Sequence, residues 1–454
     1  MFKTAENVEV FEVRTSGGHS IKATEWHKFY VATPENSLKK IQLNELSIGD
    51  VLLYTGISGE YGEAFESPTE SYPVEFSPIT YIEYCGKEDV YDVTVGDGHS
   101  VIFNGIVTGN CSEILQSQQP SVVNEDGTYA TVGRDVSCNL ASLNITKAMR
   151  GGNLEKTVDT AIRGLTAVSD LSNISAVPTV KRANNELHSV GLGAFSLHEF
   201  FLSEGISYAS QVPGDTYGNT GLRHASEEAK DFTNIYFMVV NYLALKTSND
   251  LARQRSETFV GFESSRYADP EYLKTKYSQD DHILPGDTSK RIFAKYGITI
   301  PTYEDWAKLA DDIAEYGLYN AYLQAVPPTG SISYINGGTS SIHPAVAVIE
   351  GRKEGKVGKV YYATPGVTNE NRSQFEDAYE VGPVAIIDVY AEAQKHIDQA
   401  LSLTLFYTED HTTRTYNQMY KYAHSKSLKT LYYARVRSNN VEGTSIEECV
   451  SCTL

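Results

Sequence analysis

The sequence is poor in cysteine, in positive charge and in long apolar runs. Only five of its 454 residues are cysteines, namely Cys85, Cys111, Cys138, Cys449 and Cys452. That is too few for the disulfide framework of a secreted protein of this length, and sparse cysteines in a cytosolic chain are more often catalytic or redox-active. No apolar run reaches the ~18–20 residues of a membrane span, and the N-terminus lacks the apolar core of a signal peptide. We therefore expect a cytoplasmic protein without a membrane partner.

Positive charge is scarce, with 38 Lys and Arg residues against 58 Asp and Glu and a net charge of −20. This balance disfavours nonspecific nucleic-acid binding, so we expect no nucleic-acid partner. The acidic excess is strong in residues 1–110, which hold 17 acidic against 7 basic residues. Two interpretations remain open there: a solvated acidic surface, or an electrostatic partner for a basic peptide.

The length allows roughly two to four domains, and the pattern changes at residues 110/111. Residues 1–110 read as β-rich, because Val8–Arg14 alternates with period two and further strand-like runs follow at Val51–Tyr54, Ile79–Tyr84, Val90–Val95 and Ser100–Val107. Residues 56–78 are rich in Gly, Ser, Pro and Glu and read as a loop. After Cys111, helical periodicity is predicted at residues 154–172, 224–254, 303–325, 384–403 and 411–427, with strand-like pieces at Ser331–Ile335, Ser402–Tyr407 and Thr430–Val436. Strands that alternate with helices predict an α/β architecture for residues 111–454.

The pair Asn110-Cys111 offers a specific chemistry. An asparagine side-chain amide can attack its own backbone carbonyl and cut the chain, and a following thiol is a good acyl acceptor. Upstream stand Thr24-x-x-His27, Asp92 and His99. Each motif alone is uninformative, but in this order they resemble the C-terminal part of an intein, a β-rich Hint domain. The resemblance implies that Thr24 and His27 polarise and protonate the upstream scissile amide, that His99 assists the cyclisation of Asn110, and that Asp92 tunes the cysteine chemistry.

Two departures from the intein pattern matter. Gly109 stands where most inteins have a histidine before the terminal asparagine. The cyclisation of Asn110 is therefore expected to depend more strongly on His99. The block with the N-terminal cysteine nucleophile is absent, so the resemblance implies the C-terminal piece of a split intein with a separately encoded N-terminal partner. The alternative is an inactive remnant that acts as an assembly module, with the two halves of the downstream protein associating noncovalently. A degenerate element should lose Asn110, Cys111 or His27, and all three are present.

Residues 111–454 resemble the C-terminal half of a class Ib ribonucleotide reductase large subunit. The resemblance is carried by Cys111-Ser112-Glu113-Ile114, by the run from Ser137 to Asn144, by Gly191–Phe195, by residues 325–333, by Thr430-Leu431-Tyr432-Tyr433, and by the tail from Cys449 to Leu454. It implies the second half of a ten-stranded α/β barrel, joined to residues 1–110. The family surrounds its radical cysteine as Asn-Leu-Cys-x-Glu, whereas Gly109 and Asn110 precede Cys111 here, so the pattern is completed only by splicing.

The resemblance also assigns roles. Cys111 forms the thiyl radical that abstracts the ribose 3′-hydrogen, and Glu113 handles the 3′-hydroxyl proton. Cys138 matches one of the two cysteines that reduce the 2′ position, although read alone it is a small buried hydrophobe. Tyr432 and Tyr433 match a stacked pair that relays the radical, although among 31 tyrosines a Tyr-Tyr pair is otherwise core packing.

The remaining predictions concern substrate, reductant and cofactor. Cys449-x-x-Cys452 reads as a mobile redox pair that receives electrons from a glutaredoxin- or thioredoxin-like dithiol protein, since a zinc site needs more ligands than two cysteines. The run Pro328, Thr329, Gly330, Ser331 and Ile332 is either an ordinary helix cap or a cradle for the diphosphate of a ribonucleoside diphosphate. The resemblance implies that this chain binds no cofactor, because a metal-containing (Mn or Fe) radical-generating β subunit supplies the radical in that family. A class II adenosylcobalamin enzyme is disfavoured by the tyrosine pair, and allosteric specificity is expected in the absent half.

Overall fold

Contacts between residues divide the chain into two units, Met1–Cys111 and Ser112–Leu454. The structure is a computed structural model that describes residues 2–16, 20–25, 27–32, 38–55, 74–92, 100–103, 106–109, 112–124, 126, 128–172, 174–278, 284–354 and 358–437. The predicted site residues His99, Asn110, Cys111, Cys449 and Cys452 lie outside these residues.

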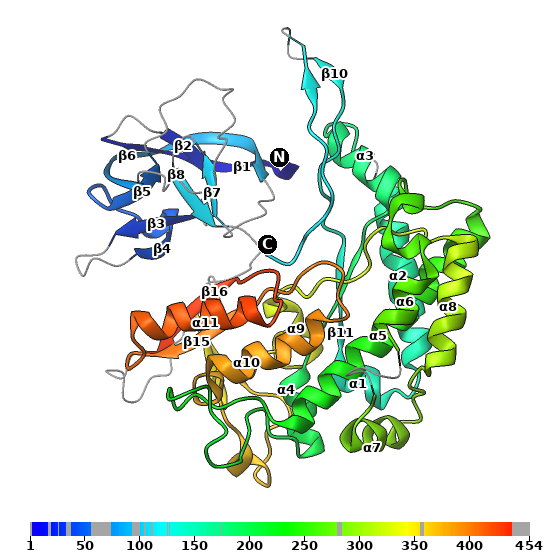
Figure 1. Cartoon of the computed structure of the whole chain (residues 1–454). Helices are drawn as coiled ribbons and strands as arrows, with labels where there is room; N and C mark the ends of the chain where they lie inside the picture. The colour runs from blue at the N-terminus through cyan, green and yellow to red at the C-terminus, as the bar shows by residue number, and fades with distance from the viewer. Residues whose placement is uncertain are drawn as a thin grey trace. The chain divides into compact units, whose positions relative to one another are not determined.

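The first unit is an antiparallel sheet, shown in blue and light blue in Figure 1. Its strands are β1 (Phe2–Thr15), β2 (Ser20–Ala23), β3 (Lys28–Ala32), β4 (Leu38–Gln42), β5 (Val51–Thr55), β6 (Val74–Asp92), β7 (Ser100–Phe103) and β8 (Ile106–Gly109). They lie in the order β2-β1-β6-β5-β3-β8-β7, with β4 also paired to β3. A short 3₁₀ turn, η1 (Leu43–Glu45), follows β4. The prediction that this part of the chain is β-rich is confirmed.

The core of this sheet follows from the polar–apolar alternation in β1. Val10 and Val13 are buried, whereas Glu9 and Arg14 are exposed. The buried positions are three residues apart because the register with β6 shifts between Glu9 and Phe11, as a β-bulge does. Val13 then packs with the other buried side chains of the sheet, which are Ile21, Ala23, Phe29, Val31, Leu43, Leu46, Leu52 and Ile79.

Two strand boundaries in the first unit differ from the sequence-based prediction. The run Ser100–Val107 is not one strand but the antiparallel pair β7 and β8, in which Phe103 pairs with Ile106. The Asn-Gly sequence between these two residues is a strong hairpin signal that the alternation concealed. The predicted loop 56–78 also ends too late, because β6 begins at Val74 and pairs with β5 from there.

The second unit is built around short parallel strands. β11 (Leu140–Asn144) pairs with β12 (Gly191–Phe195), and β15 (Thr404–Thr408) pairs with β16 (Tyr433–Arg437), both in parallel. Residues 322–326 lie between these pairs: Val190 N–H donates to Tyr322 O at 3.0 Å, and Val326 forms a parallel bridge with Leu401. Each of these strands therefore lies beside the strand that comes next in the sequence. Because the paired strands are parallel, crossover connections join them. Among the described residues these strands do not close into a barrel.

The connections between the strands are mostly helical. The helices are α1 (Ile145–Arg150), α2 (Leu154–Leu171), α3 (Pro178–Leu187), α4 (Leu197–Glu204), α5 (Glu227–Arg255), α6 (Pro270–Lys276), α7 (Asp287–Lys295), α8 (Tyr303–Tyr316), α9 (Gly330–Asn336), α10 (Ala378–Gln394) and α11 (Thr413–Ser425). Short 3₁₀ turns lie at η2 (Phe262–Ser264), η3 (Arg266–Ala268) and η5 (Arg372–Gln374), and two hairpins are formed by β9 (Val122–Val123) with β10 (Tyr129–Thr131) and by β13 (Ile349–Glu354) with β14 (Gly358–Ala363).

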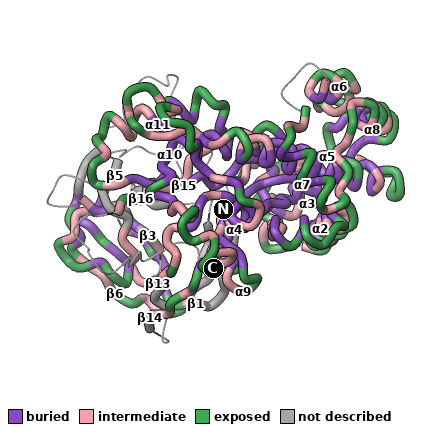
Figure 2. The backbone as a smooth tube through the Cα atoms, turned by 90° about the horizontal axis from the view of Figure 1, so that it is seen from below, coloured by how far each residue is buried: buried purple, intermediate pink, exposed green. Residues whose placement is uncertain are grey.

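The long helix α5 organises the second unit. It contacts α2, α7, α8 and α10, and Figure 2 colours most of α5 and α10 as buried. Its buried side chains include Phe232, Tyr236 and Phe237, which belong to one hydrophobic core that extends through the unit. None of the helices within the described ranges is both long and apolar enough to cross a membrane.

The predicted helices 154–172, 224–254 and 411–427 are confirmed by α2, α5 and α11. The predicted helix 303–325 is too long, because α8 ends at Tyr316 before Gly317, whose φ is 78°. The predicted helix 384–403 lies too far along the chain, because α10 covers Ala378–Gln394. The prediction missed the first residues of α10 because a non-helical Gly382 and Pro383 follow them. In both cases the apolar pattern continues past the helix because the extended residues beyond it, such as Leu323 and Leu401, are also buried. The predicted strand Ser331–Ile335 is wrong, since these residues lie within α9.

Candidate functional site

Glu113 is buried between the loop that follows Cys111 and the segment that precedes β15. Its side chain is 1% exposed. The Oε2 atom accepts hydrogen bonds from Ser402 Oγ at 2.5 Å and from the Ser112 N–H at 3.2 Å. Its backbone carbonyl accepts from the Ala400 N–H at 2.9 Å. Hydrogen bonds therefore fix both the side chain and the backbone of Glu113, the residue predicted as a proton acceptor.

Gln116, three residues after Glu113, holds the backbone of Ser137, which precedes Cys138. The side chain of Gln116 donates to Ser137 O at 2.9 Å and accepts from the Ser137 N–H at 3.2 Å, and it also donates to Gln399 at 3.1 Å. Although Cys138 keeps exposed surface, desolvation of the thiol by the surrounding protein and, to a smaller extent, the charge of Glu113 together raise its pKa to about 12. The Cys138 sulfur is therefore a protonated thiol at neutral pH.

The run Pro328–Ile332 lies at the start of α9. Thr329 is buried, and its hydroxyl accepts a hydrogen bond from the Ser341 N–H at 2.6 Å without capping the helix. Ser331 and Ile332 are exposed at the first turn. This arrangement disfavours the simple side-chain cap and leaves the first turn open to solvent.

Tyr432 and Tyr433 form a close ring pair at the start of β16. Their ring centroids lie 3.8 Å apart, and the planes are tilted by 42° rather than parallel. The Tyr432 N–H donates to Leu403 O at 2.8 Å. The tyrosine pair is thus anchored to the same segment, residues 400–403, that holds Glu113.

In the first unit, Thr24 and His27 form a turn between β2 and β3, in which the His27 N–H donates to Thr24 O at 3.0 Å. Burial lowers the pKa of His27 to about 4, so its ring is neutral at pH 7. The ring packs edge-on against Phe29 at 5.4 Å, and its buried Nε2 atom has no hydrogen-bond partner in the described part of the chain. Asp92 is the last residue of β6, and only its backbone is described.

The sequence-based prediction missed the residues that support Glu113 and Cys138. Ser402, Gln116 and Gln399 are polar, and Ser402 and Gln399 are buried at 3% and 0% exposure. A polar residue inside the otherwise apolar run that leads into β15 was the signal available for Ser402. Gln116 lies in an irregular segment with no periodic pattern, and nothing in the sequence marked it.

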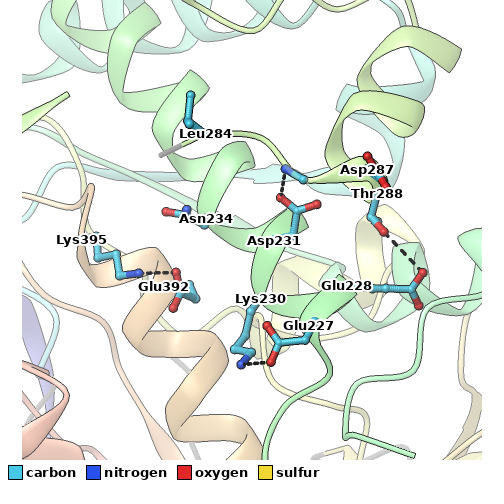
Figure 3. Close-up of a pocket in the computed structure, with 11 residues that line it drawn as sticks. Glu227, Glu228, Lys230, Asp231, Asn234, Leu284, Asp287, Thr288, Glu392 and Lys395 are labelled. Atoms are coloured by element: carbon cyan, nitrogen blue, oxygen red, sulfur yellow. Dashed lines mark hydrogen bonds and ion pairs between the residues drawn. The ribbon is translucent and has the colours of Figure 1, made fainter. Parts of the chain in front are cut away.

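A surface pocket of about 470 Å³ lies elsewhere, between α5, α7 and α10 (Figure 3). Its charged lining consists of Glu227, Glu228, Asp231, Asp287 and Glu392 with Lys230 and Lys395. Both lysines are already paired, with Glu227 at 2.6 Å and with Glu392 at 2.5 Å. Five carboxylates against two neutralised cations repel a diphosphate, and none of the predicted site residues lines this pocket. Among the described residues, no group of three or more His, Cys, Asp or Glu side chains is arranged to hold a metal ion.

Two protein-family models match the chain. The model described as "Ribonucleotide reductase, barrel domain" matches residues 103–434. The model described as "Intein splicing domain" matches residues 1–110. The two matches overlap at residues 103–110, and the splicing-domain match ends at Asn110, directly before the predicted splice junction.

The relatives are reductase subunits. Ribonucleoside-diphosphate reductase NrdEB subunit alpha of Bacillus subtilis (strain 168) is 38% identical over 436 residues, which cover 96% of this chain and 38% of the relative. Ribonucleoside-diphosphate reductase subunit alpha of Mycoplasma genitalium is 40% identical over 361 residues (77% of this chain, 48% of the relative), and the protein of the same name from Bacillus subtilis is 38% identical over 344 residues (76% and 46%). This chain spans less than half the length of each relative. Because the first match covers 96% of the chain, it includes most of residues 1–110.

Proposed function

Because this chain belongs to the ribonucleotide reductase barrel-domain family and also carries an intein splicing domain, we propose that it is a splicing precursor of a ribonucleoside-diphosphate reductase alpha subunit. Residues 1–110 excise themselves, and residues 111–454 become the C-terminal half of an enzyme that makes 2′-deoxyribonucleotides for DNA synthesis. The observation that carries the proposal is the junction itself: Cys111 directly follows the splicing-domain match, and Glu113, two residues later, is already buried and hydrogen-bonded in the second unit.

The splicing chemistry is assigned to Thr24, His27, Asp92, His99, Asn110 and Cys111. The Asn110 amide nitrogen attacks the Asn110 carbonyl carbon and breaks the peptide bond to Cys111, after the Cys111 thiol has accepted the upstream acyl group. His99 assists the cyclisation, and Asp92 tunes the cysteine. Since His27 is neutral at pH 7, it acts beside Thr24 through a neutral ring, as a hydrogen-bond donor or a proton acceptor.

We propose further that the N-terminal nucleophile comes from a separate chain, so that splicing occurs in trans. In the Bacillus subtilis NrdEB relative, the counterparts of both units lie within one chain of more than twice this length. The place where the upstream junction of the partner docks is beside Thr24 and His27, which lie between β2 and β3.

In the joined enzyme, a Cys111 thiyl radical abstracts the ribose 3′-hydrogen, and Glu113 takes the 3′-hydroxyl proton. Cys138 and a second thiol then supply two electrons and two protons, so that the 2′ C–OH bond becomes C–H, water leaves and a disulfide forms. A high thiol pKa suits this step, because Cys138 must carry its proton to the substrate. The tail cysteines Cys449 and Cys452 reduce the disulfide with electrons from a glutaredoxin- or thioredoxin-like protein.

The other parts of the second unit fit the same proposal. Its parallel strands are one half of the ten-stranded barrel, and Tyr432 with Tyr433 relays the radical that a metal-containing β subunit generates. Pro328, Thr329, Gly330, Ser331 and Ile332 cradle the substrate diphosphate, with the open first turn of α9 supplying N–H donors.

Co-expression of this chain with its N-terminal partner tests the proposal. Mass spectrometry should find a joined reductase and a free fragment of residues 1–110, and the joined protein should reduce ribonucleoside diphosphates when the β subunit and a dithiol reductant are added. Asn110→Ala should block release of residues 1–110 while a branched intermediate still forms. Normal joined product from the Asn110→Ala chain contradicts the splicing proposal, and an intact precursor that binds its partner noncovalently identifies the first unit as an assembly module instead.

A further inference from the structure

The hydroxyl of Ser402 makes the shortest described contact to the Glu113 carboxylate. Ser402 Oγ donates to Glu113 Oε2 at 2.5 Å across 289 residues of sequence, and both side chains are almost fully buried, at 3% and 1% exposure. Ser112 Oγ in turn donates to Ser402 Oγ at 3.4 Å. A short hydrogen bond to a buried carboxylate is charge-assisted, and it both orients the group and favours its ionised form.

The segment that carries Ser402 also holds other parts of the site. The Ala400 N–H donates to Glu113 O at 2.9 Å, and Leu403 O accepts from the Tyr432 N–H at 2.8 Å. Residues 400–403 therefore fix the backbone of Glu113, its carboxylate and the first tyrosine of the pair. Of these contacts, the Ser402 hydroxyl is the one that a single side-chain substitution can remove without altering the backbone.

We propose that Ser402 is a positioning residue for the reductase reaction, which keeps the Glu113 carboxylate ionised and aimed at the substrate 3′-hydroxyl. The inference rests on the proposed function, because it gives Glu113 the role of proton acceptor. Without the hydroxyl, Oε2 keeps the longer contact to the Ser112 N–H at 3.2 Å and loses the donor at 2.5 Å. Ionisation of Glu113 then requires a higher pH, and the carboxylate is free to rotate.

The charged and titratable groups nearby do not account for such an effect. The Cys138 thiol interacts electrostatically with Glu113, but its pKa of about 12 keeps it neutral throughout the acidic range. Asp398, on the same segment as Ser402, accepts from the N–H groups of Leu323 and Gln324 at 2.7 and 2.9 Å. Lys429 donates to the backbone carbonyls of residues 397–399. Burial raises the pKa of Asp398 and lowers that of Lys429, but both groups are the same in every variant, so they do not cause a difference between the pH profiles.

The test compares the joined enzyme with its Ser402→Ala and Ser402→Thr variants. For Ser402→Ala we expect kcat to fall at least about tenfold, as for loss of a hydrogen bond to a charged group, with KM little changed. The acidic limb of the pH–rate profile should move to higher pH by roughly one unit. Ser402→Thr restores the hydroxyl, so it should restore most of kcat and the original limb. Ser248→Ala removes an equally buried hydroxyl, on α5, that donates to Asn320, and it should leave the profile unchanged.

A Ser402→Ala enzyme whose acidic limb stays in place overturns the inference, even if kcat falls, because a merely structural serine affects the rate without moving that limb. Ser402→Cys, whose thiol is a weaker donor, gives the same comparison if Ser402→Ala folds poorly, with a smaller shift expected in the same direction. If the unsubstituted joined enzyme makes no deoxynucleotide, the proposed function itself is contradicted. An active unsubstituted enzyme with an unshifted Ser402→Ala profile contradicts the role of Ser402 alone.

Discussion

At the scale of single residues, His27 should couple the stability of the first unit to pH. Its pKa is about 4 in the folded chain against an ordinary value of 6.5, so the unfolded chain binds a proton more readily. The stabilisation from the neutral buried ring is complete above pH 6.5 and is lost as the pH falls from there towards 4. A shift of this size corresponds to about 3 kcal/mol in the free energy of unfolding.

Urea unfolding of wild-type and His27→Gln chains at several pH values, with proteolysis pulses that report residues 1–110, measures this coupling. The carboxylates titrate in both proteins, so the difference between the two curves isolates His27. We expect the wild-type curve to fall more steeply between pH 6.5 and 4. Parallel curves for the two proteins would show that the ring is not held neutral in the folded chain.

Cys111 and Glu113 were singled out because their motif resembles the one around the radical cysteine of the reductase family. The structure buries Glu113 in a hydrogen-bonded site, and the catalytic roles of both residues stay predictions. Ser402 could not be assigned, because its partner is 289 residues away and only the packing of strands brings the two together. The same holds for Gln116, which depends on the position of Ser137.

At the scale of secondary-structure elements, β12 requires glycine where it approaches the next strand. A Cβ atom on Gly193 would lie 2.5 Å from Ala325 O and 2.7 Å from Pro327 Cδ. Gly193→Ala should therefore push apart β12 and residues 325–327, which lead into the predicted diphosphate cradle. We expect a loss of about 1–3 kcal/mol in the free energy of unfolding, measured by urea denaturation.

Gly164→Ala is the matched control for this prediction. Gly164 lies on the exposed side of α2, and a Cβ atom there meets nothing within 4 Å. The substitution should leave stability unchanged or raise it by up to about 1 kcal/mol, because alanine is the better helix former. Equal effects of the two substitutions would contradict the close approach of β12 to its neighbour.

Elements with uninterrupted periodicity could be predicted, and those broken by special residues could not. α2 matched closely because its buried apolar residues recur every three to four positions and Gly164 does not end the helix. α5 matched because it is a long, largely buried run without glycine or proline. The prediction for α10 was shifted for two reasons. Gly382 and Pro383 interrupt the apolar pattern near the start of the helix, and buried residues after Gln394 continue that pattern beyond its end. The apolar periodicity of a sequence indicates which residues are buried, and here buried residues continue beyond the end of the helix. The pattern alone therefore could not locate that end.

At the scale of the whole molecule, the acidity of residues 1–110 predicts that the rate of association with the N-terminal partner depends on salt. With 17 acidic against 7 basic residues, this unit should attract a basic partner segment, and screening should slow the association. Stopped-flow mixing with the N-terminal partner at low and high salt measures the rate. An unchanged rate would show that the acidic surface is only solvated, and it would leave the splicing chemistry untouched.

Cys111 has two proposed roles, one in splicing and one in the reductase reaction, and a single substitution can separate them. In the unspliced chain Cys111 is bonded to Asn110 instead of the Asn-Leu pair of the reductase motif, so we expect no reductase activity before splicing. Cys111→Ser should still splice, more slowly, because a hydroxyl also accepts an acyl group. The spliced Cys111→Ser enzyme should be inactive, because an alcohol O–H bond is too strong for reversible hydrogen exchange with ribose. Splicing yield by gel, followed by nucleotide reduction with the β subunit and a dithiol, measures both roles, and deoxynucleotide formed by the spliced Cys111→Ser enzyme would overturn Cys111 as the radical site.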